Sequence, residues 1–286
     1  MEYYSPLRYP GGKGRLIDFM KLVFRENLLC DGCYIEPYAW GASLAMALLL
    51  NEYAARIVIN DLDRSIYAFW HSVINRTDEL CDLINKAKFN ITAWEQQKEI
   101  QRNKFKCSLF DLGFSTFYLN RTNRSGIIDG GVIGGLEQTG KWKMDARFNK
   151  DDLIRRIMRI AAYKHRIEIH NLDACKLLQK ISSAVPRRTL FYFDPPYFIK
   201  GHALYVNHYK PQDHVSVAKQ ITSLKRHRWI VSYDYTSEIS QLYHSFRRKR
   251  YFVNYSAGLH GKGEEVMFFS DNLFVPSGVS KCISLG

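Results

Sequence analysis

The sequence predicts a doubly wound α/β domain that an inserted second domain interrupts. Three short segments rich in apolar and β-branched residues are typical of buried parallel strands, and three more are candidates. The clear segments are 34–36, 56–60 and 190–193, and the further candidates are 167–169, 229–232 and 265–269. Helical patterns lie between them, for example at 43–53 and at 151–162, which begins with acidic residues that suit a helix N-terminus. This alternation favours a sheet with helices on both faces.

The alternation stops between residues 69 and 149. This stretch begins as polar helical sequence and then becomes rich in glycine, at 130–135 and 140–143. Glycine-rich sequence with little apolar periodicity indicates loops or hairpins instead of sheet core. We therefore expect an inserted domain whose loops face a partner, within a catalytic domain made of two parts. The predicted catalytic parts are 1–68 and 157–286, and the predicted insertion is 69–156.

The charge balance indicates an anionic partner. Lys and Arg outnumber Asp and Glu by 41 to 28, which gives a formal net charge of +13. Such an excess raises the local concentration of polyanions, of which nucleic acid is the commonest soluble one. The apolar run at 44–50 is far too short to cross a bilayer, and residues 1–6 lack the layout of a signal peptide. Cys30 and Cys33 form a lone CxxC pair, so free thiols, no metal and a cytoplasmic protein are expected.

The sharpest chemical signal is the Asp-Pro-Pro-Tyr tetrapeptide at 194–197, directly after a predicted strand. In open α/β sheets, ligands bind at the carboxyl ends of strands, where this tetrapeptide would lie. The two prolines fix backbone torsions and remove two N–H groups, which leaves a carboxylate and rigid carbonyls as acceptors beside an aromatic ring. Such acceptors suit an exocyclic amine. When they accept hydrogen bonds from its N–H groups, the lone pair of the nitrogen is less delocalised into the ring and can act as a nucleophile. A plain turn at the end of a strand is the alternative interpretation.

Together with three further landmarks, the tetrapeptide makes the sequence resemble the D12 class of DNA adenine methylases, the Dam-like family, over nearly the whole chain. In the family's order, the landmarks are YPGGK at 9–13, IEPY at 35–38, ND at 60–61 and DPPY at 194–197. The target-recognition segment falls between the last two, which is the arrangement of the alpha group. The resemblance implies a Rossmann-like methyltransferase sheet, S-adenosylmethionine as the cofactor and double-stranded DNA as the partner.

The resemblance and the chemistry of the side chains assign three sets of site residues. The expected catalytic residues are Asp194, Pro195, Pro196 and Tyr197. The expected cofactor-binding residues are Tyr9, Gly11, Gly12, Lys13, Glu36, Pro37, Tyr38, Trp40, Gly41, Asp61 and Asp173. The expected DNA-binding residues are Arg121, Asn123, Arg124, Ser125, Lys141 and Trp142.

Several cofactor assignments keep a plain structural alternative. A glycine-rich turn before a helix offers N–H groups to a ligand, and Lys13 either pairs with the cofactor's carboxylate or is solvated. Asp61 suits the two ribose hydroxyls, with Asp63 as its nearby competitor. Asp173 resembles the family residue near the cofactor's adenine, and it is equally suited to cap a helix.

Trp40 departs from the family pattern. The family's cofactor loop reads Glu-Pro-Phe/Tyr-x-Gly-Gly/Ala, and Trp40 stands where its first glycine is expected. Glycine allows close backbone approach or unusual torsions, and tryptophan supplies neither. The indole either turns outward, stacks on the cofactor or fills the pocket, and only the last would abolish catalysis. We expect cofactor binding to be retained.

The predicted reaction is direct methyl transfer from S-adenosylmethionine to N6 of an adenine flipped out of DNA. Flipping requires strong phosphate anchoring, for which the basic runs 225–228 and 247–250 are candidates, with solvated helix faces as the alternative. The segment 255–265 resembles the family's late loop, which precedes the final hairpin. The alternatives are methylation of cytosine N4 or of an RNA base, and a DNA-binding relative that has lost activity through Trp40.

Overall fold

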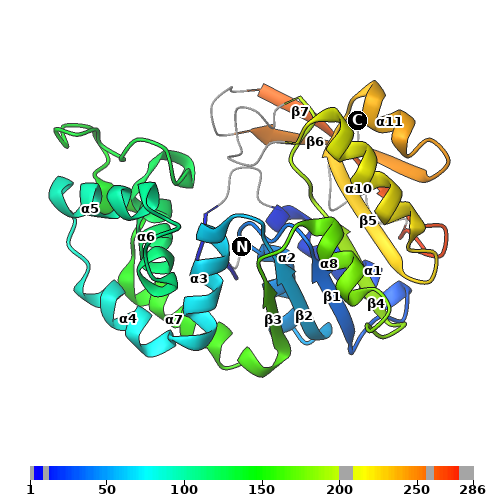
Figure 1. The fold of residues 1–286 in the computed structure, drawn as a ribbon, viewed down its shortest axis with the longest axis horizontal. Coiled ribbons are helices and arrows are strands. Elements are labelled where there is room, and N and C mark those ends of the chain that lie inside the picture. Colours follow the sequence, from blue (N-terminus) through cyan, green and yellow to red (C-terminus); the bar gives the residue numbers. More distant parts are fainter. Residues whose placement is uncertain (1–2, 9–12, 200–208, 256–260, 277–286) are drawn as a thin grey trace. The chain divides into compact units, whose positions relative to one another are not determined.

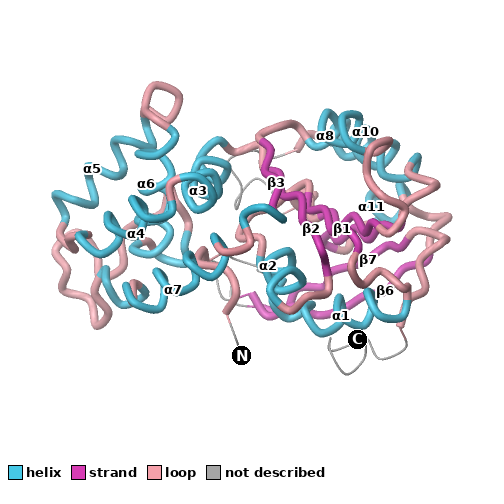
Figure 2. The backbone as a smooth tube through the Cα atoms, turned by 90° about the horizontal axis from the view of Figure 1, so that it is seen from below, coloured by secondary structure: helices cyan, strands magenta, loops and turns pink. Residues whose placement is uncertain are grey.

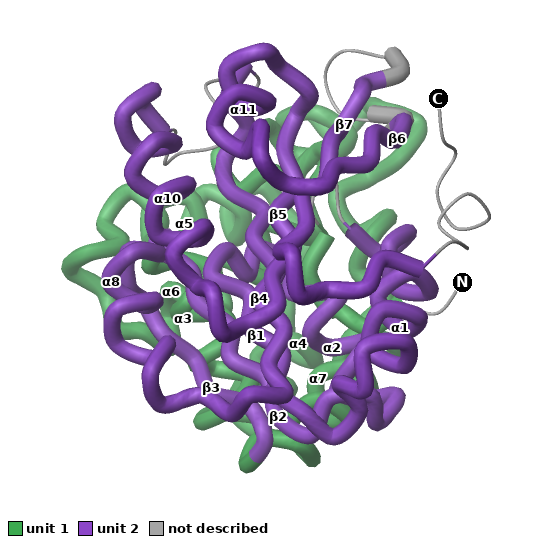
Figure 3. The backbone as a smooth tube through the Cα atoms, turned by 90° about the vertical axis from the view of Figure 1, so that its right-hand side faces the viewer, with its two compact units in different colours: residues 1–12, 64–165 green, residues 13–63, 166–286 purple. Residues whose placement is uncertain are grey.

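The computed structural model describes residues 3–8, 13–199, 209–255 and 261–276. The chain divides into two compact units (Figure 3). Unit 1 comprises residues 1–12 and 64–165, and unit 2 comprises residues 13–63 and 166–286. Unit 2 is therefore assembled from two stretches of chain that the main part of unit 1 separates in the sequence.

Unit 2 is built on a seven-stranded mixed sheet with the order β3-β2-β1-β4-β5-β7-β6 (Figure 1). The strands are β1 (Gly32–Glu36), β2 (Ala54–Asn60), β3 (Ile167–His170), β4 (Thr189–Phe193), β5 (Arg228–Asp234), β6 (Arg247–Tyr255) and β7 (Gly261–Phe269). Strands β1 to β5 pair in parallel, whereas β7 is antiparallel to both β5 and β6. The predicted α/β fold is confirmed, and each strand expected from the sequence is present.

Helices cover both faces of this sheet (Figure 2). The helices of unit 2 are η1 (Lys13–Leu16), α1 (Ile17–Glu26), α2 (Ser43–Leu50), α8 (Ala174–Ile181), α10 (Pro211–Ser223) and α11 (Ser237–Leu242). Helices α1 and α2 lie on one face, and α8 and α10 lie on the other. On the second face, Phe191 and Val231 of the sheet pack with Leu177 of α8 and Ile221 of α10 in a hydrophobic core cluster.

The helix predicted at 43–53 ends early, at Leu50. Glu52 has a φ of 58°, a left-handed torsion that interrupts helical hydrogen bonding, and β2 begins at Ala54. The other predicted helix, at 151–162, is confirmed as α7 (Lys150–Ala161), in which Asp151 and Asp152 occupy the first turn.

The strand order reverses between β1 and β4. After β1 the chain builds β2 and β3 on one side, and it then crosses back to place β4 on the other side of β1. Such a reversal opens a crevice at the carboxyl ends of the two central strands, which is where ligands bind in open α/β sheets. The segments that follow Glu36 and Phe193 both leave the sheet at this edge.

Unit 1 is helical. Its helices are α3 (Arg64–Asn75), α4 (Thr77–Lys86), α5 (Ile91–Arg102), α6 (Leu109–Thr122) and α7, with the short turns η2 (Arg124–Gly126) and η3 (Met144–Arg147). A further turn, η4 (Lys164–Arg166), precedes β3. The glycine-rich residues between η2 and η3 form loops, as their composition predicts. Phe117 and Tyr118 of α6 are buried in the core of this unit.

The structure can be compared with the sequence on two features, membrane-spanning helices and cysteine thiols, within the described part of the chain. No helix there is long and apolar enough to span a bilayer. The cysteines described are free thiols, and they are Cys30, Cys33, Cys81, Cys107 and Cys175.

Gly113 of α6 marks a close approach between α6 and α3. A Cβ at this position would lie 2.3 Å from Ser72 Oγ and 2.5 Å from the Ala68 carbonyl oxygen. We expect Gly113→Ala to lower the free energy of unfolding by about 1–3 kcal/mol, even after the roughly 1 kcal/mol that alanine gains over glycine in a helix. Gly131→Ala is the matched control, because a Cβ there meets nothing within 4 Å. Urea unfolding measures both variants, and equal stabilities would contradict the close packing.

Candidate active site

Asp194 lies at the reversal point, directly after β4, with 14% of its side chain exposed. Its Oδ1 atom accepts a hydrogen bond from Ser232 Oγ of β5 at 2.9 Å and lies 3.2 Å from Lys13 Nζ. Among the described residues, all hydrogen-bonding partners of this carboxylate are on Oδ1. Within the described part of the chain, the second oxygen, Oδ2, has no hydrogen-bonding partner.

The ammonium group of Lys13 is buried between two carboxylates. Lys13 Nζ donates to the hydroxyl of Tyr197 at 2.6 Å and to Oε2 of Glu265 at 3.0 Å, in addition to its contact with Asp194. Glu265 is fully buried in β7, where its carboxylate also accepts hydrogen bonds of 2.5 Å from the hydroxyls of Tyr197 and Tyr251. Three segments distant in the sequence thus meet in one network of charges and hydroxyls.

This network changes the acidity of its members. Burial raises the pKa of Asp194 to about 6, and the nearby charge of Glu265 contributes, although Lys13 opposes both. Burial also acts to raise the pKa of Glu265, but Lys13 and the hydroxyls of Tyr197 and Tyr251 outweigh it and leave that pKa lowered. Asp194 and Glu265 in turn hold the pKa of Lys13 above its usual value against the effect of burial. At neutral pH, two carboxylates therefore share one ammonium group.

Glu36 ends β1 beside this network. Its carboxyl group is buried, with 4% exposure, and accepts a hydrogen bond of 2.8 Å from Tyr34. Burial raises the pKa of Glu36 to about 8, so the group is mainly protonated at pH 7. In the loop that follows, the Pro37 carbonyl accepts from Asn60, and the Tyr38 hydroxyl shares a hydrogen bond of 2.7 Å with that of Tyr209.

Trp40 keeps the backbone torsion that a glycine would favour. Its φ is 45°, in the left-handed region, at a cost of roughly 1–2 kcal/mol for a non-glycine residue. The Trp40 backbone N–H donates to Asp61 Oδ2 at 3.0 Å, and its indole N–H donates to the backbone carbonyl of Asp194 at 3.0 Å. The half-buried indole is thus turned toward the tetrapeptide 194–197 and connects the loop after β1 with the end of β4.

Asp61 and Asp173 both bind backbone N–H groups. Asp61 follows β2, and its Oδ1 accepts from the N–H of Asp63 at 2.9 Å. Asp173 caps α8, because its Oδ1 accepts from the N–H groups of Cys175 and Lys176 at 3.0 and 3.2 Å. The helix-capping interpretation of Asp173 is therefore confirmed, and its second oxygen does not take part in the cap.

The remaining cofactor candidates differ in what the structure describes. Gly41 is buried in the turn before α2. Tyr9, Gly11 and Gly12 lie outside the described residues.

The structure gives Arg121 and Asn123 a structural role at the end of α6. Arg121 is 8% exposed, and its guanidinium donates to the Pro6 carbonyl, at 2.8 Å from Nε. Burial lowers the pKa of Arg121 to about 9, and the neighbouring guanidinium groups add to this effect. Asn123 is fully buried and accepts from the indole N–H of Trp94 at 2.7 Å. Both side chains hold the polypeptide from inside the unit, so the expectation that they contact DNA gains no support.

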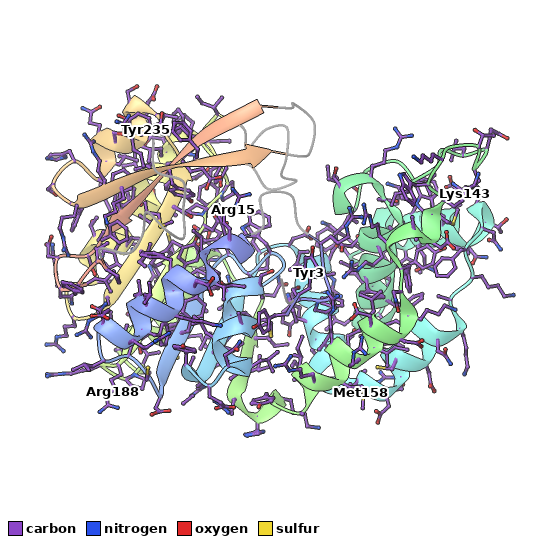
Figure 4. The ribbon with its side chains drawn as sticks, turned by 180° about the vertical axis from the view of Figure 1, so that it is seen from behind. Tyr3, Arg15, Lys143, Met158, Arg188 and Tyr235 are labelled. Atoms are coloured by element: carbon purple, nitrogen blue, oxygen red, sulfur yellow. The ribbon has the colours of Figure 1, made fainter. Side chains whose placement is uncertain are left out.

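The other DNA-binding candidates lie at the surface of unit 1. Arg124 and Lys141 are exposed, and Trp142 is 66% exposed, with the Lys141 ammonium 5.7 Å from the centre of its ring. Ser125 is half-buried and has a φ of 57°. Figure 4 labels Lys143, the next residue of the same glycine-rich region.

The interpretation of 255–265 as a loop before the final hairpin is wrong. Strands β6 and β7 are themselves that hairpin, because Tyr255 pairs with Gly261 and the register continues to Arg247 and Phe269. The described residues of this segment are the end of β6 and the beginning of β7, and residues 256–260 lie outside the described structure. This places Glu265 in the sheet, beside Lys13.

No sequence motif indicates a catalytic or cofactor-binding role for Glu265, Ser232 or Tyr251. Glu265 lies 252 positions from Lys13 along the chain, and no local pattern links the two. The available signal is a glutamate that opens the apolar run 265–269, because a charge inside a buried strand needs a partner.

The model of the D12 class N6 adenine-specific DNA methyltransferase family matches residues 9–256. Comparison with the curated proteins gives no match. Among solved structures, protein LPL1258 from Legionella pneumophila str. Philadelphia 1 is similar with a TM-score of 0.41 and 9% identity, over 95% of this chain and 91% of that chain. The rRNA methyltransferase aviRa from Streptomyces viridochromogenes is similar with a TM-score of 0.36 and 9% identity, over 88% of this chain and 83% of that chain.

At these TM-scores the two solved structures carry no argument about activity. The family match does, because it spans most of the chain and includes the segments after β1, β2 and β4 that form the site. The seven-stranded sheet of this protein, with its antiparallel hairpin, matches the S-adenosylmethionine-dependent methyltransferase fold. The chain belongs to the D12 class N6 adenine-specific DNA methyltransferase family.

Proposed function

We propose that this protein transfers a methyl group from S-adenosylmethionine to N6 of an adenine flipped out of double-stranded DNA. The observation that carries the proposal is the Asp194 carboxylate. Its Oδ1 is held by Ser232 and Lys13, whereas no donor among the described residues bonds to its Oδ2. A carboxylate held by one oxygen presents the other in a defined direction, which is what recognition of an amine requires.

The chemical task of the site is to make an amine nucleophilic. The N6 lone pair of adenine is delocalised into the ring, and acceptors for its two hydrogens favour a tetrahedral nitrogen with a localised lone pair. Asp194 Oδ2 and the carbonyl of Pro195 are the two acceptors, and they act by orientation and preorganised charge. Tyr197 offers its ring to the base, and the contacts of its hydroxyl with Lys13 and Glu265 hold that ring in place.

The side chains at the carboxyl ends of the strands fit the proposed cofactor by their chemistry. Asp61 and Asp173 each accept hydrogen bonds from backbone N–H groups, and carboxylate oxygens of this kind are acceptors that suit hydroxyl and amino donors. Glu36 and the turn through Pro37, Tyr38, Trp40 and Gly41 complete the set, with Tyr9, Gly11 and Gly12 assigned by the family pattern. S-adenosylmethionine, when bound, supplies an electrophilic methyl group on a sulfonium sulfur. Lys13 serves the Asp194 carboxylate in this proposal, because its ammonium group is already paired there.

Unit 1 supplies the proposed contacts with DNA. Flipping a base costs a few kcal/mol, which phosphate contacts must offset. Arg124, Lys141 and Trp142 are exposed, and Ser125 follows Arg124 in the chain. Exposed cations beside an aromatic ring suit a nucleic-acid backbone and its bases. The proposed DNA contacts therefore come from these four residues.

Asp194→Asn removes the carboxylate and keeps its size. We expect the methylation rate to fall by about 10²–10³-fold or more, the cost typical of losing an oriented charge-stabilising group, while calorimetry shows unchanged binding of S-adenosylmethionine. Asp271→Asn, at an exposed aspartate, is the matched control and should leave the rate unchanged. Mass spectrometry of nucleosides from treated DNA and RNA identifies the product. Methylation of cytosine or of RNA, or a normal rate in Asp194→Asn, would refute the proposal.

Trp40→Phe keeps an aromatic ring and removes the indole N–H that the Asp194 carbonyl accepts. We expect roughly a tenfold loss in methylation rate, the equivalent of one hydrogen bond, because the peptide between the two catalytic acceptors loses its anchor. Calorimetry should show that the wild type, Trp40→Phe and Trp40→Gly bind S-adenosylmethionine alike. If only Trp40→Gly bound the cofactor, the indole would fill the pocket and the binding-only alternative would be correct.

Lys141→Ala tests the proposed DNA surface. We expect the dissociation constant for double-stranded DNA to rise, and the slope of log affinity against log salt to decrease by about one, because one phosphate contact is lost. Lys86→Ala is the matched control, since Lys86 is an exposed lysine at the end of α4 in the same unit. Fluorescence anisotropy over a salt series measures both variants. Equal effects would show that only overall charge matters.

A further inference from the structure

We propose that Glu265 is a positioning residue for the catalytic carboxylate, because it shares the Lys13 ammonium with Asp194 and anchors the Tyr197 hydroxyl. The inference rests on the proposed function in taking Asp194 as the catalytic acceptor. It concerns a residue on the last strand of the sheet, far in the sequence from each of the family landmarks at 9–13, 35–38, 60–61 and 194–197.

Glu265 is buried where a charge is costly. It pairs in register with Asp234 of β5 and with Tyr251 of β6, and the four residues that follow it in β7 are buried and apolar. An ionised carboxylate in such a position strongly destabilises the fold unless partners compensate it. Lys13, Tyr197 and Tyr251 compensate it here, so the charge is retained within a network that includes Asp194.

Lys13 divides its three N–H donors among three partners. They are the Tyr197 hydroxyl at 2.6 Å, Glu265 Oε2 at 3.0 Å and Asp194 Oδ1 at 3.2 Å. The contact with Asp194 is the longest of the three. If Glu265 lost its charge, Asp194 would be the one carboxylate among these three partners, and the ammonium group would draw more electron density from it. By pairing with Lys13, Glu265 therefore weakens the interaction of Lys13 with the Asp194 carboxylate, which is the acceptor for the amine.

The same sharing sets the protonation of Asp194. Among the described residues, the groups that interact with its carboxylate are Lys13 of η1, Tyr34 and Glu36 of β1, Tyr192 of β4, Ser232 and Tyr233 of β5, Tyr251 of β6 and Glu265 of β7. Burial raises the pKa of Glu36 to about 8, and burial also raises the pKa values of the four tyrosines, so these groups are mainly neutral at pH 7. Lys13 and Glu265 are thus the charges that act on Asp194, and they act in opposite directions.

The sign of the expected pH effect follows from this opposition. Asp194 accepts from an amine only as a carboxylate, so methylation should be complete above its pKa of about 6 and be lost as the pH falls through that value. Removing the negative charge of Glu265 leaves Lys13 to act on Asp194 unopposed, which lowers the pKa of Asp194. The acidic limb of the pH–rate profile should then move to lower pH.

The decisive variant is Glu265→Gln, with Glu264→Gln as its matched control. Glu264 is the preceding residue of the same strand, half-buried and paired with Arg250 at 3.1 Å. We expect the acidic limb of single-turnover methylation to shift down by on the order of one pH unit in Glu265→Gln, and to stay in place in Glu264→Gln. The rate above pH 7 should also fall in Glu265→Gln, since Lys13 then weakens the acceptor. An unmoved limb in Glu265→Gln would overturn the inference.

A second readout does not depend on activity. Carbon-13 labelling of aspartate carboxyl groups reports the titration of Asp194, which Asp194→Asn assigns by difference. We expect this titration to move to lower pH in Glu265→Gln. If no variant or wild type methylates DNA but the titration moves, the proposed function fails while the coupling of Glu265 to Asp194 stands. If the wild type methylates DNA and the titration does not move, the coupling fails alone.

Tyr251→Phe keeps the inference testable if Glu265→Gln does not fold. This variant removes one hydrogen bond to Glu265 Oε2 and no charge. Glu265 should then attract Lys13 more strongly, so the limb and the Asp194 titration should move to higher pH, opposite to the effect of Glu265→Gln. Movement to lower pH, or no movement, would contradict the inference.

Discussion

The buried ammonium group of Lys13 is the interaction on which the rest of the site depends. It joins the first turn of unit 2 to the residue after β4 and to the last strand, and so links the two stretches of chain that form this unit. A buried charge is tolerated only when partners satisfy all of its donors, and the three partners of Lys13 do so. The geometry of the Asp194 carboxylate therefore depends on strands from both stretches of chain, and the antiparallel strand β7 is part of the candidate site.

Trp40 illustrates a second constraint, on the loop after β1. The chain must turn sharply from the strand into α2, and both Trp40 and Ala42 adopt left-handed torsions to do so. The cost of that torsion in a tryptophan is offset by hydrogen bonds that a glycine could not make in full, because the indole reaches the Asp194 carbonyl. A change that breaks the family pattern in sequence thus preserves the backbone path and adds a connection between the ends of β1 and β4.

The sequence predicts the strands and the tetrapeptide 194–197 because both are local signals: an apolar run has a period, and a proline pair has fixed torsions. It cannot predict Glu265 as a partner of Lys13, since strand pairing and helix packing decide that contact over 252 residues. The same limit explains why the burial of Arg121 and Asn123 could not be predicted. In sequence they form part of a polar, basic loop, but the helix α6 continues to Thr122 and turns their side chains inward, where backbone carbonyls and an indole occupy them.

Charge is distributed unevenly within this basic chain. The net charge is +13, yet the carboxyl ends of the central strands carry Glu36, Asp61, Asp173 and Asp194, with Glu265 behind them and Lys13 as the cation paired with Asp194. Glu36 is mainly protonated at pH 7, but the carboxylates of the aspartates at this edge favour a cationic ligand and an amine, whereas the excess of Lys and Arg elsewhere favours a polyanion. The proposed methyl donor, with its sulfonium centre, and the proposed nucleic-acid substrate have these two opposite requirements, and the acidic groups that suit the first lie in unit 2.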